Sequence, residues 1–400
     1  TLLKVMAGLS RPSAGTVRQA VDQARVAYLG HQTFLYPRLT ALENLRFWAR
    51  LFGRASDEAA LLAALERVGL DRAAHEEAGA FSRGMAQRLS LARVFLTAPE
   101  LLFLDEPGTG LDVRSRHVLR AEIAAWLARS RGFSVSPDDI FVTAGATHAL
   151  HLLADLLCAG GKKVLIEDPC HGGMLKTFQR QGCAVVPVPV DDRGIRTDLL
   201  PADADARAAY VTPSHQFPMG GILPAGRRAA LIRFARERDL YVIEDDYDSE
   251  FRYAGAPVAP LCAMDPQRVI YVGTFSKTVF PVLRIGYEVL PKRLQEPWLA
   301  RRMYMDVQNP PFEQAALAEF LKTRRLDRHI RRMRGLYGRR RQALFAALTQ
   351  SLGADWTACG DAAGLHVAIE IPGMRFGEAF SRRCAEAGVF VTPLEAHCIE

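Results

Sequence analysis

The sequence of 400 residues has little cysteine, no paired cysteine motif and no long apolar run. Its seven cysteines all follow position 150, with no Cys-x-x-Cys pair and no histidine at a spacing that suggests zinc. We therefore expect reduced thiols, no metal site and a cytoplasmic protein. No apolar run is long enough to cross a bilayer, and no charged-then-apolar leader opens the chain. It begins with Thr1 rather than methionine, which indicates an internal starting point.

An excess of charge of one sign is also lacking. The formal net charge is +7, and basic and acidic residues are mostly interspersed, so charge gives no argument for a nucleic-acid partner. One basic run, residues 324–341, is predicted to be the solvated face of a helix. The hydrophobic content of 49% over 400 residues predicts two or more domains with packed cores.

Two short apolar strands are predicted in the first part of the chain, at residues 26–29 and 101–104, with helices through 42–47 and over 58–68 between them. Asp105 and Glu106 follow the second strand. Ligands of parallel α/β sheets bind beyond the carboxyl ends of strands, so these acids could hold magnesium and polarise a water. The alternative is that they simply begin a loop.

The runs Phe81–Arg88, Leu104–Pro107 and Gly110–Asp112 make this segment resemble the ATP-binding subunit of an ABC transporter, most similar to the haem-exporter branch. The resemblance implies a partial P-loop domain over 1–116. It also implies nucleotide-site residues in the Q-loop, signature, Walker B and D-loop motifs, at Gln32, Ser82, Gly84, Gln87, Asp105, Glu106 and Asp112. The family's Gly-Lys-Ser/Thr loop would precede Leu2 and is not in this sequence, so we expect a vestigial site without ATP hydrolysis.

After a predicted helix over 119–132, the chain alternates strands and helices. The predicted strands are residues 140–143, 163–167, 184–190, 208–211, 241–244, 269–272 and 284–290. The most evident helices are 147–157, 226–238 and 311–323. This alternation predicts an α/β fold with a mostly parallel, helix-covered sheet. The link between the last two strands is too short for a crossover helix, so we expect that pair to be antiparallel.

Lys277 follows one of these strands, and Asp245 and Tyr247 follow another. Pyridoxal phosphate chemistry needs a lysine for the imine, an acid that keeps the ring nitrogen protonated, and donors for the phosphate. Lys277 and Asp245 could supply the first two, and Tyr247 could bond the ring hydroxyl. The alternatives are a surface lysine, a loop acid and a packing tyrosine; for Asp246 and Asp248 we expect solvated loop acids.

Phosphate donors are predicted in two places. Gly145, Ala146 and Thr147 lie between a strand and a helix, where free backbone amides and the helix dipole favour an anion. Thr274, Ser276 and Arg284 flank the lysine and could close the other side.

These motifs resemble the fold-type-I aminotransferase domain of MocR-type transcription regulators. The matching runs, from about residue 119 to 400, are Val142–Gly145, Ile166–Pro169, Thr212–Pro218, Glu244–Tyr253, Tyr271–Arg284 and His329–Tyr337. The resemblance implies a large domain over 117–297 and a small domain over 298–400 that is truncated at its end. It implies that Lys277 is the aldimine lysine, that Asp245 and Tyr247 meet the ring nitrogen and oxygen, and that Thr274 and Arg284 meet the phosphate. His171 would have to stack on the ring, and His215 joins the cofactor residues through its motif.

We therefore expect a chimera whose larger part is an aminotransferase-like protein that binds pyridoxal 5'-phosphate and acts on, or senses, an amino acid or amine. The family's site is completed in a homodimer, and its winged helix-turn-helix is not in this sequence, so DNA binding is not implied. The alternatives are an ATP-binding subunit of an ABC transporter and a fragment of a pyridoxal-phosphate-dependent transcription regulator.

Overall fold

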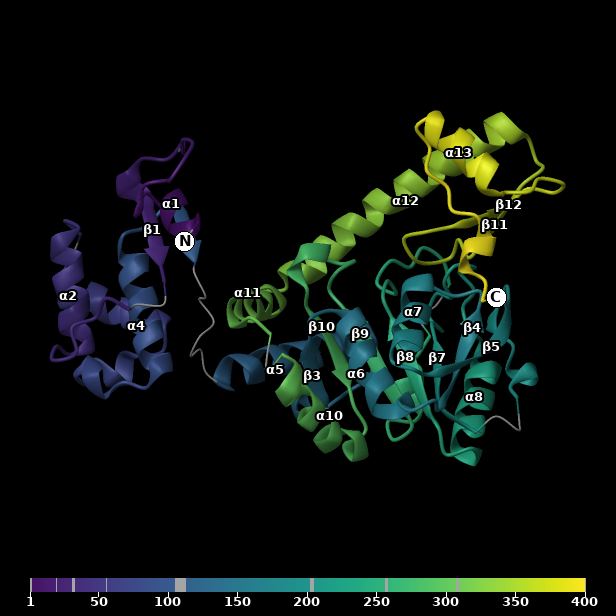
Figure 1. Cartoon of the computed structure of the whole chain (residues 1–400), viewed down its shortest axis with the longest axis horizontal. Coiled ribbons are helices and arrows are strands. Elements are labelled where there is room, and N and C mark those ends of the chain that lie inside the picture. The colour runs from purple at the N-terminus through teal and green to yellow at the C-terminus, as the bar shows by residue number, and fades with distance from the viewer. Residues whose placement is uncertain are drawn as a thin grey trace. The chain divides into compact units, whose positions relative to one another are not determined.

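The computed structural model describes residues 2–18, 20–30, 33–54, 56–104, 113–201, 205–255, 258–306 and 309–399 (Figure 1). The chain divides into two compact units. The first comprises Thr1–Ser115 with Pro310–Phe312, and the second comprises Arg116–Asn309 with Glu313–Glu400.

The first unit joins a small sheet to a cluster of helices. Strands β1 (Val26–Leu29) and β2 (Leu101–Leu104) pair in parallel and have the bounds predicted from the sequence. The helices are α1 (Leu2–Met6), α2 (Ala41–Leu51), α3 (Glu58–Arg67) and α4 (Arg83–Leu96). Leucines such as Leu45, Leu61 and Leu89 form its buried core. The predicted helices within 42–47 and 58–68 are confirmed as α2 and α3.

Helix α2 begins with a reciprocal capping box. Thr40 Oγ1 accepts a hydrogen bond from the Glu43 amide at 3.2 Å, and Glu43 Oε2 accepts one from the Thr40 amide at 2.8 Å. Helix α3 begins with a simpler cap, in which Asp57 Oδ1 accepts from the Ala60 amide at 2.9 Å. Each cap satisfies amide groups that have no partner inside the helix.

Thr40→Ala should loosen α2 and leave α3 unchanged. Loss of an N-cap hydroxyl costs about 1 kcal/mol, which corresponds to roughly fivefold faster amide exchange in the first turn of the helix. Hydrogen exchange followed by mass spectrometry on peptides from α2 and α3 measures both. Asp57→Ala is the matched control, because it removes the cap of α3 alone. Equal exchange of α2 in the wild type and Thr40→Ala would contradict the assignment.

The second unit is built on an eight-stranded sheet with the order β3-β10-β9-β8-β7-β4-β5-β6. The strands are β3 (Ile140–Thr143), β4 (Lys163–Asp168), β5 (Ala184–Asp191), β6 (Gly194–Ile195), β7 (Ala206–Val211), β8 (Tyr241–Asp246), β9 (Val269–Thr274) and β10 (Gly286–Val289). Strand β10 is antiparallel to both β3 and β9, whereas β9, β8, β7, β4 and β5 are parallel neighbours. The predicted α/β sheet and its antiparallel pair are confirmed. The carboxyl ends of β3, β4, β7, β8 and β9 consequently lie at one edge.

Helices cover both faces of this sheet (Figure 1). The helices that follow the first unit are α5 (Val113–Ser130), α6 (Ala146–Cys158), α7 (Gly172–Arg180), α8 (Ala225–Glu237), α9 (Leu261–Met264), α10 (Lys292–Met305), α11 (Pro311–Lys322), α12 (Arg325–Leu352) and α13 (Glu378–Glu386). Of these, α12 runs away from the sheet, and α13 lies beside the C-terminal hairpin (Figure 1). Neighbouring residues of β8 enter different cores, because strand side chains alternate between faces. Val242 packs in the core that contains Trp126, and Ile243 packs in the core that contains Phe178 and Trp298.

Helix α12 carries most of the basic run and leads to the hairpin of β11 (Thr357–Cys359) and β12 (Ala368–Glu370) (Figure 1). Its buried residues Leu326 and Ile330 lie near its start, whereas arginines such as Arg331 and Arg332 are exposed. The predicted solvated helix face is confirmed. Within the described ranges, no helix combines the length and the apolar character needed to cross a membrane.

Candidate cofactor site

Asp245 lies near the carboxyl end of β8 and is buried. Its Oδ2 accepts a hydrogen bond of 2.7 Å from the Tyr210 hydroxyl on β7. Burial raises the pKa of this carboxyl group to about 7, with smaller contributions from Asp246 and Asp248, although the Tyr210 hydrogen bond opposes the shift. No group among the described residues donates to the other oxygen, Oδ1. The carboxyl group thus keeps one unused acceptor in a buried place, which is unusual unless a ligand supplies the donor.

Tyr247 follows β8 and contacts the loop after β7. Its hydroxyl donates to the His215 carbonyl oxygen at 2.8 Å and lies 3.2 Å from His215 Nδ1. Burial, followed by the charge of Asp248, holds the pKa of the phenol well above its usual range. Tyr247 is therefore a neutral phenol whose one proton is donated to His215 in this structure.

The expectation that Asp246 and Asp248 are solvated is wrong, because they are only 5% and 1% exposed. Strand β8 continues to Asp246, whose Oδ2 lies 2.8 Å from the Arg131 guanidinium and accepts from the Tyr271 hydroxyl at 2.5 Å. Asp248 pairs with His215 instead. Acids this deeply buried need such partners. The partners lie far away in the sequence, so the run of acids looked like an exposed loop.

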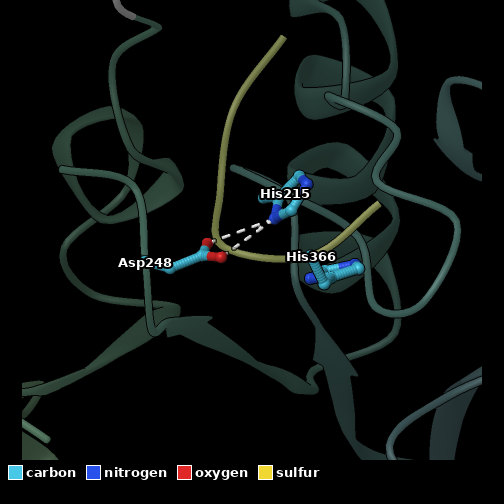
Figure 2. Close-up of side chains that lie close together, drawn as sticks. All are labelled: His215, Asp248 and His366. Atoms are coloured by element: carbon cyan, nitrogen blue, oxygen red, sulfur yellow. Dashed lines mark hydrogen bonds and ion pairs between the residues drawn. The ribbon is translucent and has the colours of Figure 1, made fainter. Parts of the chain in front are cut away.

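Figure 2 shows that His215, Asp248 and His366 lie close together. Tyr247 adjoins this cluster through its contact with His215. His215 Nδ1 lies 3.2 Å and 3.1 Å from the two carboxylate oxygens of Asp248, and the two imidazole rings are 4.4 Å apart between centroids. The ligand atoms of the three side chains lie within 4.8 Å of one another, and two imidazoles with a carboxylate are a donor set that a transition metal can use. The hydrogen bonds between His215 and Asp248 satisfy both groups without a metal.

His366 should make the protein sensitive to acid. Burial, followed by the charge of His215, lowers the pKa of the His366 imidazole to about 4, below the value of about 6.5 expected in the unfolded chain. A lowered pKa means that its contribution to stability is present above pH 6.5 and is lost as the pH falls toward 4. The free energy of unfolding should therefore fall more steeply between these values in the wild type than in His366→Gln.

Urea denaturation at several values of pH between 7 and 4 measures this difference. Other histidines are present in both proteins, so their effects cancel in the comparison. His151→Gln removes a histidine outside the cluster and is the control. Parallel curves for the wild type and His366→Gln would contradict the prediction.

Lys277 follows β9 at the same edge of the sheet. Thr274 ends the strand, and its Oγ1 accepts from the Ser276 amide at 3.2 Å and donates to Ser276 Oγ at 3.1 Å, which fixes the turn before the lysine. The Lys277 side chain is exposed. Its charge, after burial and His397, contributes to lowering the pKa of His171. The lysine therefore lies near the loop after β4.

Of the predicted phosphate donors, Arg284 meets the amino end of α6 after β3. Gly145 caps α6 with φ +87°, and Arg284 Nη2 donates to the Ala144 carbonyl oxygen at 2.8 Å. A Cβ atom on Gly145 would lie 2.9 Å from the same nitrogen, so the glycine permits this contact. The amino end of α6, with Ala146 and the exposed Thr147, thus lies beside a guanidinium group. Both features favour an anion.

His171 has a local role that the sequence did not reveal. Its Nδ1 accepts from the Gly173 amide at 3.1 Å and caps α7, while its ring lies 5.1 Å from that of Phe217 at an angle of 54°. The His397 carbonyl oxygen accepts from the Cys170 amide at 2.9 Å, which brings the described C-terminal residues to this loop. Sequence reasoning missed the parts played by Tyr210, Phe217 and His366, because only the folded chain brings them to Asp245 and Tyr247.

The predicted nucleotide residues are only partly described. Gln32, Asp105, Glu106 and Asp112 lie outside the described residues. Ser82 caps α4 by accepting from the Met85 amide at 3.3 Å, Gly84 lies in the first turn of α4, and Gln87 is buried in the same helix. Of the predicted nucleotide residues, the described chain therefore shows only the three of the signature motif, which lie at α4.

Comparison with known proteins finds two families. The family model for class I and II aminotransferases matches residues 84–398, and the ABC transporter model matches residues 1–109. The uncharacterized HTH-type transcriptional regulator YhdI of Bacillus subtilis is 35% identical over 73% of this chain and 62% of its own length. The probable rhizopine catabolism regulatory protein MocR of Rhizobium meliloti is 36% identical over 69% of this chain and 56% of its own length. The 2-aminoadipate transaminase of Thermus thermophilus is 29% identical over 69% of each chain.

Solved structures show the same fold. An archaeal alanine:glyoxylate aminotransferase has a TM-score of 0.66 and 31% identity over 70% of this chain and 72% of its own. LysN, the alpha-aminoadipate aminotransferase of Thermus thermophilus, has a TM-score of 0.64 and 28% identity over the same shares, and its structure is complexed with N-(5'-phosphopyridoxyl)-L-leucine. The predicted cofactor, pyridoxal phosphate, is the one that this fold uses. With a match over residues 84–398, this chain belongs to the class I and II aminotransferase family.

Proposed function

We propose that the carboxyl edge of the large sheet binds pyridoxal phosphate through Lys277, and that the protein acts on, or senses, an amino acid or amine. The observation that carries this proposal is the buried Asp245 carboxyl group, whose Oδ1 has no donor among the described residues. Lys277, Arg284 and the amino end of α6 follow strands that end at the same edge. The residues present therefore fit the cofactor.

Asp245 would hold the ring nitrogen. A protonated ring nitrogen at Oδ1 gives a charge-assisted hydrogen bond in a buried place, and its positive charge would lower the raised pKa of the carboxyl group. Tyr210 keeps the other oxygen occupied and so fixes the orientation of the carboxylate. Bound in this way, the cofactor supplies an electron sink for reactions at the substrate α-carbon.

The remaining predicted residues would bind the other parts of the cofactor. Tyr247 would turn its one hydroxyl proton from the His215 carbonyl oxygen to the ring oxygen, and His171 would lie against the ring face. The phosphate would meet the Arg284 guanidinium, the amides at the start of α6 and the hydroxyls of Thr274 and Ser276, which combine a cation with a helix dipole.

Lys277 would have two roles. Its Nζ would hold the cofactor covalently, with loss of one water, and as a free amine it would take the proton from the α-carbon of a bound substrate. We further propose that residues 117–297 form the cofactor-binding large domain, that residues 298–400 form the small domain, and that the functional unit is a homodimer.

Whether the protein turns over its ligand or only senses it is an experimental question, because its relatives include both regulators and a transaminase. A visible absorption band on addition of pyridoxal phosphate tests the proposal. Adding a panel of amino acids and amines then separates the roles, since turnover converts the band progressively and sensing shifts it to a stable end point. Failure of the wild type to give any band would refute the proposed function.

Nucleotide binding is the second candidate, because the ABC transporter model matches residues 1–109. It has less support, since four of its seven predicted residues lie outside the described chain. We also propose that the chain is a chimera of the two families.

A further inference from the structure

His215 has a hydrogen-bond acceptor at each ring nitrogen. Nδ1 faces the Asp248 carboxylate at 3.1 Å, and Nε2 lies 3.3 Å from the Gly360 carbonyl oxygen. A neutral imidazole has only one N–H group, so only the doubly protonated ring can donate to both acceptors. Asp248 Oδ2 also accepts from the Leu365 amide at 3.0 Å, as an ionised carboxylate does well. The two side chains are 1% exposed, and with His215 protonated they form a buried ion pair.

This ion pair fastens three parts of the chain together. His215 lies in the loop after β7, and Asp248 lies in the loop after β8. Gly360 and Leu365 belong to the segment between β11 and β12, which we define as the 360–366 segment. The Gly364 amide adds a bond of 2.7 Å to the Phe251 carbonyl oxygen. The small C-terminal hairpin is thereby held against the edge of the sheet that carries the candidate site.

Glycines allow this segment to approach closely. A Cβ atom on Gly364, which has φ +81°, would lie 1.9 Å from His215 Cε1, and one on Gly360 would lie 2.1 Å from the Gly220 Cα atom. Contacts this short leave no room for a side chain. The backbone of the segment therefore packs directly against the loop that carries His215.

The ion pair also reaches the cofactor site through Tyr247. The Tyr247 hydroxyl donates to the His215 carbonyl oxygen and lies 3.2 Å from Nδ1, so the single Nδ1–H group of an imidazolium is shared between the Asp248 carboxylate and the phenol oxygen. A phenol that accepts such a bond becomes a stronger donor itself, because linked hydrogen bonds polarise one another. The groups that face His215 are Asp248, Tyr247 and His366, and the low pKa of His366 leaves it neutral.

We propose that His215, held as an imidazolium by Asp248, is a positioning residue that docks the 360–366 segment and orients Tyr247 toward the ring oxygen of the cofactor. The docking part concerns this chain alone. The orientation part rests on the proposed function, and the two parts are tested separately.

Hydrogen exchange on the cofactor-free protein tests docking. Asp248→Asn and His215→Gln should each make amides of the 360–366 segment exchange at least about tenfold faster, because local opening no longer breaks the ion pair. The amides of β9 in the same sample report global unfolding, so the ratio of the two rates is the measured quantity. His151→Gln, which removes a half-buried histidine bonded to Gln181, should leave the ratio unchanged. Unchanged ratios in both cluster variants would overturn the docking role.

Spectral titration of the cofactor-loaded protein tests orientation. A nearby cation lowers the pH midpoint of the visible band, so its removal in His215→Gln should raise that midpoint by about one pH unit. The shift should shrink in a Tyr247→Phe background, because the two residues act through one another. If His215 had only a packing role, His215→Gln would weaken cofactor binding and any shift of the midpoint would be the same with Tyr247 or Phe at position 247. An unchanged midpoint would overturn the orientation role. Absence of any band in the wild type would overturn it together with the proposed function, while the exchange ratios still decide docking.

Discussion

Lys277→Ala should abolish covalent attachment of pyridoxal phosphate completely. Lys277 follows β9 at the sheet edge that also carries Asp245, and an alanine there offers no amine for the cofactor. The wild type, loaded with cofactor and reduced with borohydride, should gain the mass of one reduced cofactor on the peptide that contains Lys277. The variant should gain none and should lose the visible band.

Lys176→Ala is the matched control, because Lys176 is another exposed lysine of the same unit and lies on a helix, α7. It should behave as the wild type does. A borohydride-fixed label that persists in Lys277→Ala would show that another lysine carries the cofactor, and the assignment would be wrong.

Asp245→Asn should weaken cofactor binding by roughly a hundredfold. The variant replaces a buried, charge-assisted hydrogen bond with a neutral one, a loss of about 2–3 kcal/mol, and each 1.4 kcal/mol is a factor of about ten in affinity. Without the carboxylate the ring nitrogen also tends to lose its proton, so any reaction with amines should slow as well. Titration with pyridoxal phosphate, followed by absorption, measures the dissociation constant.

Tyr210→Phe provides the comparison for Asp245→Asn. It removes the hydrogen bond to Asp245 Oδ2 but keeps the carboxylate, so affinity should fall by about fivefold, as expected for one neutral hydrogen bond of about 1 kcal/mol. If Asp245→Asn bound the cofactor as tightly as the wild type, the ring nitrogen would have to lie elsewhere.

The sequence predicted the sheet well because its strands are nearly continuous apolar runs. Strands β1, β2 and β3 have the predicted bounds, and the antiparallel pairing of β9 with β10 followed from a short link. Strands β6, β11 and β12 were not predicted, because two or three residues give no periodic signal. The fold class could thus be predicted because most strands of the large sheet have a clear run of apolar residues.

The candidate site was predictable only where its chemistry is local. Lys277, Asp245 and Tyr247 each lie at or just after the end of a strand and carry an informative side chain. Burial of Asp246 and Asp248 could not be predicted, because Arg131 and His215 meet them only in the folded chain. The same holds for His366. Its ring contacts that of His215, although the two residues are far apart in the sequence, so no motif spacing could have predicted the contact.

Helix α12 has a mechanical consequence. It is unbroken for 28 residues, and its buried residues, Leu326 and Ile330, lie within its first two turns. A helix of that length is a rod of about 42 Å at about 1.5 Å per residue. Turning it by about 5° at the anchored end would carry the other end by roughly 4 Å. The middle of this rod is held as well, because Arg334 donates to the Glu250 carbonyl oxygen at 3.0 Å and 2.6 Å and Arg341 lies 3.6 Å from the Asp361 carboxylate. A movement of the helix would therefore be passed directly to the 360–366 segment, which contains Asp361.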